Sequence, residues 1–218
     1  ELVRYGIRDA KDPLIEDSLK VVDALLKVET PAGPCWKRYN HDGYGQRADG
    51  SPYSGWGQGR PWPLLVGERG HYELKAGRDV QDYIRTMERF ASPMGLLPEQ
   101  VWDGPDLPAC RLRPGGVTGA AMPLMWAHAE YLKLLRSALD GAVFDEFPEV
   151  AERYLQNPRP VPIEIWKPNR RIRQMVSDRT LRILAPRPFR LRWSLSGWKE
   201  IGVSRSHPTT LGVEYVDL

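Results

Sequence analysis

The 218-residue sequence predicts a mainly α-helical region that is followed by a small β-sandwich domain. Apolar residues recur at helical spacing through much of the first 155 residues. After the Pro-rich segment 157–160, short alternating runs separated by turn residues take their place. We therefore expect a domain boundary at about residue 156, with domains covering 1–156 and 157–218.

The first helix is expected to begin after Asp12, because a capping aspartate followed by Pro13 is a helix-start signal. Apolar residues then follow at helical spacing at Leu14, Leu19, Val22, Leu25 and Leu26. Further helices are expected at 62–76, 79–91, 119–139 and 147–155. His71 and His128 fall on these helices beside apolar residues, which favours structural roles for both.

Strands are expected beyond the boundary at 161–166, 170–176, 180–185, 189–195 and 211–216. Residues 158–218 carry 12 Lys and Arg against 5 Asp and Glu, whereas the first 157 residues carry 19 against 23. The arginines of this basic region alternate with apolar residues, which places them on the solvated face of strands. This pattern favours a solvated sheet face over nucleic-acid binding, so no nucleic acid is predicted as a partner.

Several function classes are excluded by what the sequence lacks. No run of 18 apolar residues is present, so neither a transmembrane helix nor a membrane partner is predicted. The GxSxG, HExxH, P-loop and GxGxxG patterns are also missing. Neither Cys35 nor Cys110 has metal-ligand spacing, and we predict no metal or cofactor. Whether these two cysteines form a disulfide or stay free thiols is left open by the sequence.

The candidate functional residues lie in two loops. The segment 29–61 is too long for a plain connection, and it contains KRYNHDGYGQ (37–46) and runs into SGWGQGRPW (54–62). Aromatic faces cover the apolar side of a pyranose, while arginine and carboxylates bind its hydroxyls. Anchoring of the loop to the core by its tryptophans explains the composition equally well. The second loop, LLPEQVWD (96–103), holds a glutamate that is either a rigid pocket carboxylate or a turn cap.

Three segments stand in order along the chain, GRPWPLLVGERGHYEL (59–74), LLPEQVWD (96–103) and AAMPLMWAHAEYLKLL (120–135), and KRYNHDGYG (37–45) precedes them. In this order and spacing they resemble bacterial glucoamylases and glucodextranases of glycoside hydrolase family 15, and KRYNHDGYG is similar to the family's Arg-Tyr segment. The resemblance covers roughly residues 1–155. It implies the C-terminal half of an (α/α)6 barrel of six helical hairpins, with an active site built from long loops at one end.

The resemblance also assigns roles to individual residues. Glu99 matches the catalytic general base, Arg38 matches the arginine that hydrogen-bonds the terminal glucose, and Trp62 matches the tryptophan that lines the sugar pocket. Tyr39, Trp56 and Gln100 lie beside them and are further substrate-binding candidates. The implied activity is exo-acting, inverting hydrolysis that releases glucose from the non-reducing ends of α-glucans.

The chain departs from the family pattern in its extent. It offers about half of the helices of such a barrel, and no second glutamate stands in the family's general-acid context. We therefore expect a piece of a longer protein that is inactive without the missing N-terminal half of the barrel. The alternative is a non-catalytic carbohydrate-binding or barrel-completing fragment. Linkage preference stays open, as does localisation, where a secreted or periplasmic protein is favoured over a cytoplasmic one.

Overall fold

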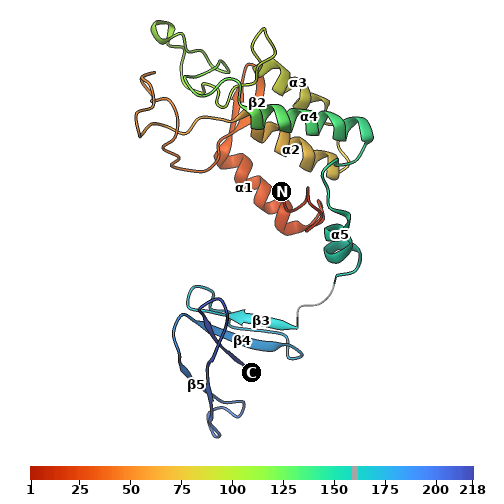
Figure 1. Cartoon of the computed structure of the whole chain (residues 1–218), viewed down its shortest axis with the longest axis vertical. Coiled ribbons are helices and arrows are strands. Elements are labelled where there is room, and N and C mark those ends of the chain that lie inside the picture. The colour runs from red at the N-terminus through yellow and green to blue at the C-terminus, as the bar shows by residue number, and fades with distance from the viewer. Residues whose placement is uncertain (159–161) are drawn as a thin grey trace. The chain divides into compact units, whose positions relative to one another are not determined.

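The computed structural model describes residues 1–158 and 162–218, and it divides into two compact units (Figure 1). The first unit is Glu1–Pro158 and the second is Arg159–Leu218. The division lies within the Pro-rich segment that the sequence marks as a boundary. Each unit is described by itself below.

The first unit is built mainly from helices joined by long loops (Figure 1). Its elements are, in chain order, α1 (Pro13–Leu26), β1 (Lys27–Thr30), β2 (Gly33–Trp36), α2 (Pro63–Lys75), α3 (Gln81–Phe90), the 3-10 turn Pro108–Cys110, α4 (Met125–Asp140), α5 (Pro148–Ala151) and the π-helical turn Glu152–Gln156.

The start of α1 is confirmed as the sequence predicts it. The Asp12 side chain accepts a hydrogen bond from the Leu14 N–H at 2.9 Å, and Pro13 occupies the first helical position. In contrast to the other long helices, α1 has no buried residue, and Leu14, Val21 and Leu25 are exposed. The apolar face formed by these three residues is therefore open to solvent in the chain as described, whereas Val22 and Leu26 of the same helix pack against the core.

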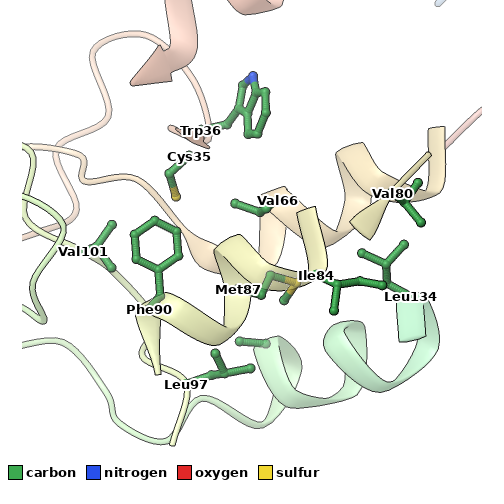
Figure 2. Packing of buried hydrophobic residues seen from close by; sticks show 11 residues of the cluster. Cys35, Trp36, Val66, Val80, Ile84, Met87, Phe90, Leu97, Val101 and Leu134 are labelled. Atoms are coloured by element: carbon green, nitrogen blue, oxygen red, sulfur yellow. The ribbon is translucent and has the colours of Figure 1, made fainter. Parts of the chain in front are cut away.

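The core of the first unit lies between α2, α3 and α4, with β2 against α2 (Figure 2). Val66 of α2, Met87 of α3 and Leu134 of α4 are fully buried in it. Two glycines of α2 allow α4 to come close: a Cβ at Gly67 would lie 2.5 Å from the Cγ of Glu130, and one at Gly70 would lie 2.7 Å from Leu134. The loops that carry the candidate site extend from this helical layer.

Two expectations for the first unit are corrected. A hairpin of β1 and β2 occupies the start of the expected loop 29–61, because the Thr30 hydroxyl donates to the Gly33 carbonyl at 2.8 Å and closes the turn. The helix expected from residue 119 begins at Met125 instead. The residues before it pair with the other loop, since Glu99 N–H donates to the Ala121 carbonyl at 2.8 Å, and Pro123 disfavours helical conformation in the residue before it.

The second unit consists of two small sheets. One has the order β3-β4-β8-β7, in which β3 and β4 are parallel, and the other is the antiparallel pair β5-β6. The strands are β3 (Ile163–Trp166), β4 (Thr180–Ala185), β5 (Arg190–Trp193), β6 (Gly202–Arg205), β7 (His207–Pro208) and β8 (Glu214–Asp217).

The expected strand 180–185 is confirmed with its bounds, and those at 161–166, 189–195 and 211–216 are confirmed within a few residues. Residue 161 lies outside the described residues. The strand expected at 170–176 is wrong, because this segment pairs with no strand among the described residues. Alternation of arginine with apolar residues indicates a half-exposed strand only where a partner exists. The strands β6 and β7 were not predicted.

Cys35 and Cys110 are both free thiols, the first buried and the second exposed. They therefore form no disulfide in this structure, which decides between the two alternatives that the sequence leaves open. Burial raises the pKa of the Cys35 thiol well above its ordinary value. Among the described residues, no helix has the length and apolar character needed to span a membrane.

Candidate functional site

Glu99 lies in the loop between α3 and α4, where backbone pairing fixes its position. On either side of the Glu99–Ala121 bond, Leu124 N–H donates to the Leu97 carbonyl at 2.9 Å and Trp102 N–H donates to the Gly116 carbonyl at 2.7 Å. These bonds hold the two loop segments together as a short ladder. Glu99 is only 8% exposed, so its carboxylate is fixed in a largely dehydrated place.

The Glu99 carboxylate is held by neutral donors. The Tyr44 hydroxyl lies 3.2 Å from Oε1 and 3.4 Å from Oε2, and the Ala121 N–H donates to Oε2 at 3.2 Å. Within the part of the chain that the structure describes, no Lys, Arg or His lies within ion-pair distance of it. The carboxylate thus accepts hydrogen bonds from neutral groups, and no cation occupies its remaining lone pairs.

Tyr44 connects Glu99 to an aromatic cluster. Its ring lies 5.1 Å from that of Tyr53 in an edge-on arrangement and 6.2 Å from that of Trp62. Burial, together with the negative charge of Glu99, raises the pKa of the Tyr44 hydroxyl, which therefore keeps its proton and acts as a donor. Tyr44 was not among the predicted site residues.

Arg38 stands beside this cluster and is fixed by Asp42. Its Nε and Nη2 donate to the two Asp42 oxygens at 2.8 and 2.9 Å, and Asp42 also accepts from the Tyr44 N–H at 2.9 Å. Burial alone would raise the pKa of Asp42, but the bonds from Arg38 and Tyr44 hold that pKa below its ordinary value. The guanidinium carbon lies 5.0 Å from the Tyr44 ring centre and 4.9 Å from that of Trp62. Arg38 is thereby oriented while its edge stays partly exposed.

Trp62 closes the cluster from the start of α2. Its backbone N–H donates to the Trp36 carbonyl at 2.8 Å, which ties the helix start to β2. The ring is buried, and its Nε1 has no hydrogen-bond partner among the described residues. A buried indole N–H without an acceptor is unusual, and here it lies in the same cluster as Arg38 and Tyr44.

The remaining predicted residues lie around this cluster. Gln100 is fully buried, and its Nε2 donates to the Tyr44 carbonyl at 3.1 Å, so it supports Tyr44 from behind. Tyr39 is exposed, and its ring lies 5.3 Å from the Arg38 guanidinium. Trp56 is also exposed, and the Arg47 guanidinium lies 3.9 Å from its ring. The structure therefore brings Glu99, Arg38 and Trp62 together through Tyr44, with Tyr39 and Trp56 towards solvent.

Charged residues of the same loops form a second cluster of ion pairs. Arg60 donates to the Asp103 carboxylate at 2.6 Å and to the Gln46 carbonyl at 2.9 Å, and its guanidinium lies 3.9 Å from the Trp102 ring. Lys37 pairs with the second Asp103 oxygen at 2.7 Å. Within the described residues, no group of three His, Cys, Asp or Glu side chains is arranged to hold a metal ion.

His71 and His128, as predicted, lie inside helices. His71 is fully buried, with Nδ1 placed 3.0 Å from the Gly67 carbonyl and 2.9 Å from a Glu130 oxygen. His128 Nε2 accepts a hydrogen bond from the Leu97 N–H at 3.0 Å. Both rings thus hold local backbone or side-chain structure, and the bonds described for Glu99 come from Tyr44 and Ala121 instead.

Comparison with known proteins finds a family and close relatives. Residues 1–136 match the model of the glycosyl hydrolases family 15. A glucoamylase of Clostridium sp. (strain G0005) is 48% identical over 155 residues, which are 71% of this chain and 21% of that protein. The crystal structure of a bacterial glucoamylase complexed with acarbose is 48% identical, with a TM-score of 0.65, over 71% of this chain and 22% of that one. The chain thus spans about a fifth of the length of these relatives.

Proposed function

Because the chain belongs to the glycosyl hydrolases family 15, we propose that it supplies the catalytic base and part of the sugar pocket of an exo-acting, inverting α-glucoside hydrolase. The observation that carries the proposal is the environment of Glu99. This carboxylate is nearly buried and held by the Tyr44 hydroxyl and the Ala121 N–H, and no cation among the described residues pairs with it. A carboxylate in this state can accept a proton from a water molecule.

The proposed reaction needs a second carboxyl group. In an inverting hydrolase, one carboxylic acid protonates the leaving oxygen while a carboxylate activates water on the opposite face of the sugar, and the two groups lie roughly 6.5–9.5 Å apart. We assign the base to Glu99 and the acid to the N-terminal half of an (α/α)6 barrel. The open apolar face of α1 supports such a contact, because exposed apolar faces of this kind mark interaction surfaces.

The sugar pocket is proposed to form around Arg38 and Trp62. Arg38 is oriented by Asp42 and keeps N–H groups for sugar hydroxyls, and the buried Trp62 ring forms an apolar wall behind Arg38 and Tyr44. The unpartnered Trp62 Nε1 is a further donor in the cluster. Tyr39 and Trp56 extend the aromatic surface towards solvent, whereas the buried Gln100 positions Tyr44. The acarbose complex of the related glucoamylase supports an α-glucan oligosaccharide as the substrate class.

The test of the base is Glu99→Gln in a protein that joins this chain to the N-terminal half of the barrel. We expect kcat on maltose and isomaltose to fall at least 10³-fold, with KM little changed, because the amide keeps the shape of the carboxylate but cannot take up the proton. Glu149→Gln, at an exposed position of α5, is the matched control and should leave kcat unchanged. Near-normal kcat in Glu99→Gln would remove Glu99 from the role of base.

The alternative is a fragment that completes a barrel or binds glucan without contributing to hydrolysis. Reassembly of the two barrel halves distinguishes this alternative from the proposed base. The 218-residue chain alone should release no glucose and should self-associate through the open α1 face. Adding the N-terminal half in trans should restore hydrolysis, and restoration that persists with Glu99→Gln would favour the alternative. A monomeric chain that hydrolyses maltose by itself would contradict both the assignment of the acid and the proposed contact.

A further inference from the structure

The β5–β6 hairpin of the second unit carries three arginines on one face. In its register Arg190 stands directly opposite Arg205, and Arg192 stands opposite Val203. These four positions are exposed, whereas Leu191, Trp193, Gly202 and Ser204 of the other face are partly buried. The exposed face of the hairpin is therefore a cluster of guanidinium groups around one valine.

This arginine cluster has no acidic partners within the described part of the chain. Arg179 and Arg182 of the same unit pair with Glu164 and Asp217, but no carboxylate lies within ion-pair distance of Arg190, Arg192 or Arg205. Like charges directly opposite each other destabilise a strand pair. An anion bound on this face would relieve that repulsion.

The tip of the hairpin, residues 194–201, exposes three apolar side chains. Leu195 is 92% exposed and Trp198 is 64% exposed, and Ile201 is also exposed. Within 189–206 the basic residues are Arg190, Arg192, Lys199 and Arg205, and the one acidic residue is Glu200. The hairpin thus combines basic strands with exposed apolar side chains at its tip.

The tip is held in shape before any partner binds. The Ser194 hydroxyl oxygen accepts hydrogen bonds from the Ser196 and Trp198 N–H groups at 3.2 and 2.9 Å, and the Ser196 hydroxyl oxygen accepts from the Glu200 N–H at 2.9 Å. Trp198 has a φ of 69°, in the left-handed region that bulky residues rarely adopt. These bonds keep Trp198 in this conformation, and a preformed tip reduces the ordering cost of binding.

We propose that this hairpin binds a membrane surface that contains anionic lipids. Arginine forks bind phosphate oxygens in pairs, which suits lipid headgroups. Tryptophan prefers the membrane–water interface, and the exposed Leu195 and Ile201 suit the acyl boundary. A nucleic acid or a polyanionic sugar would use the arginines but offers little to aliphatic side chains. This inference revises the expectation of no membrane partner and is independent of the proposed hydrolase.

The test is co-sedimentation of the 218-residue chain with vesicles of phosphatidylcholine, with and without phosphatidylglycerol. We expect binding only to the anionic vesicles, and weaker binding as salt is raised. The triple variant Arg190→Gln, Arg192→Gln, Arg205→Gln should lower the binding constant at least tenfold. The control Lys167→Gln, Arg171→Gln, Arg173→Gln removes the same charge from exposed positions of the same unit and should retain binding.

The apolar tip is tested separately with Leu195→Ser combined with Trp198→Ser. This variant should also lower binding several-fold, whereas Leu211→Ser, at a position 86% exposed on another turn, should not. Equal losses in the control variants would reduce the effect to net charge and overturn the proposal. An unchanged binding constant in both hairpin variants, as adsorption through α1 would give, also overturns the proposal. The proposal is also overturned if dextran sulfate or an oligonucleotide binds as tightly as the vesicles do and this binding is unchanged in the tip variant.

Discussion

Glu130 and Glu99 are both buried in the first unit, and their surroundings differ. Glu130 of α4 accepts from Arg4 Nη1 at 2.8 and 3.0 Å and lies 2.9 Å from His71, and Arg4 also pairs with Asp145 at 2.9 Å. Glu99 accepts only from neutral donors. The first carboxylate is neutralised and belongs to the framework, whereas the second keeps oxygens that are available to a proton.

A partly buried glutamate of the same unit has neither kind of support. Glu68 of α2 lines a cavity of about 370 Å³ between the N-terminal segment, α1 and α2. Burial, followed by the negative charges of Glu1 and Glu130, raises its pKa to about 7. Burial without a nearby donor thus favours the protonated form of Glu68, whereas the Glu99 carboxylate accepts hydrogen bonds from Tyr44 and Ala121.

The largest effect is expected for Glu130→Gln, which removes the ion-paired carboxylate. We expect the free energy of unfolding of the chain to fall by about 3 kcal/mol, because Arg4 would remain buried with only part of its counter-charge. Urea denaturation measures the change, and Glu149→Gln on the surface is the control. A loss below about 1 kcal/mol would mean that the Arg4 cluster is no framework element.

The second variant is Glu68→Gln, whose effect depends on pH. Because the pKa of Glu68 in the folded chain is about 7 against an ordinary 4.5, folding binds its proton more tightly, and stability is lost as the pH rises between those values. Removing the charge should therefore raise the free energy of unfolding by about 2 kcal/mol at about pH 8 and by little at about pH 4, after allowance for partial exposure.

Urea midpoints of the wild type and of Glu68→Gln at both pH values test this, with the exposed Glu16→Gln of α1 as control. Equal stabilisation at both pH values would show that packing rather than the charge of Glu68 is responsible.

Local signals in the sequence predict much of this molecule. Asp12 and Pro13 fix the start of α1 because a cap is set by neighbouring residues, and the apolar spacing predicts α2 and α3 within two residues of each end. The strand at 180–185 is predicted for the same reason. The segment 170–176 has a similar pattern but is not a strand, because pairing is decided by residues far along the chain.

The contacts between the candidate site residues could not be predicted from the sequence. Motif resemblance identifies Glu99, Arg38 and Trp62, but Tyr44 is separated from Glu99 by 55 residues, and only the folded loops bring them together. Asp42 lies four residues after Arg38 in a loop, where that spacing predicts no contact. The burial of Gln100 behind Tyr44 is likewise a tertiary effect that spacing does not reveal.

A smaller effect is expected on the binding side of the site. In the enzyme with both barrel halves, Arg38→Ala should raise KM for maltose about tenfold, because a partly exposed arginine loses charge-assisted hydrogen bonds to the sugar. Asp42→Asn removes the charge that orients Arg38, so this variant should also raise KM. Arg85→Ala, on the surface of α3, is the matched control. Unchanged KM in both site variants would mean that the ion pair only braces the loop.

The smallest effect concerns the donor that distinguishes Glu99 from Glu130. Tyr44→Phe removes the hydroxyl bound to Glu99 but keeps the ring that packs on Tyr53 and Trp62. We expect kcat on maltose to fall about fivefold with KM unchanged, since one neutral hydrogen bond contributes about 1 kcal/mol and the Ala121 N–H still holds the carboxylate. Tyr53→Phe removes a neighbouring hydroxyl that makes no bond to Glu99, and its kcat should match the wild type. If Tyr44→Phe instead raised KM alone, Tyr44 would act on the substrate, and the orientation of Glu99 would depend on the loop backbone.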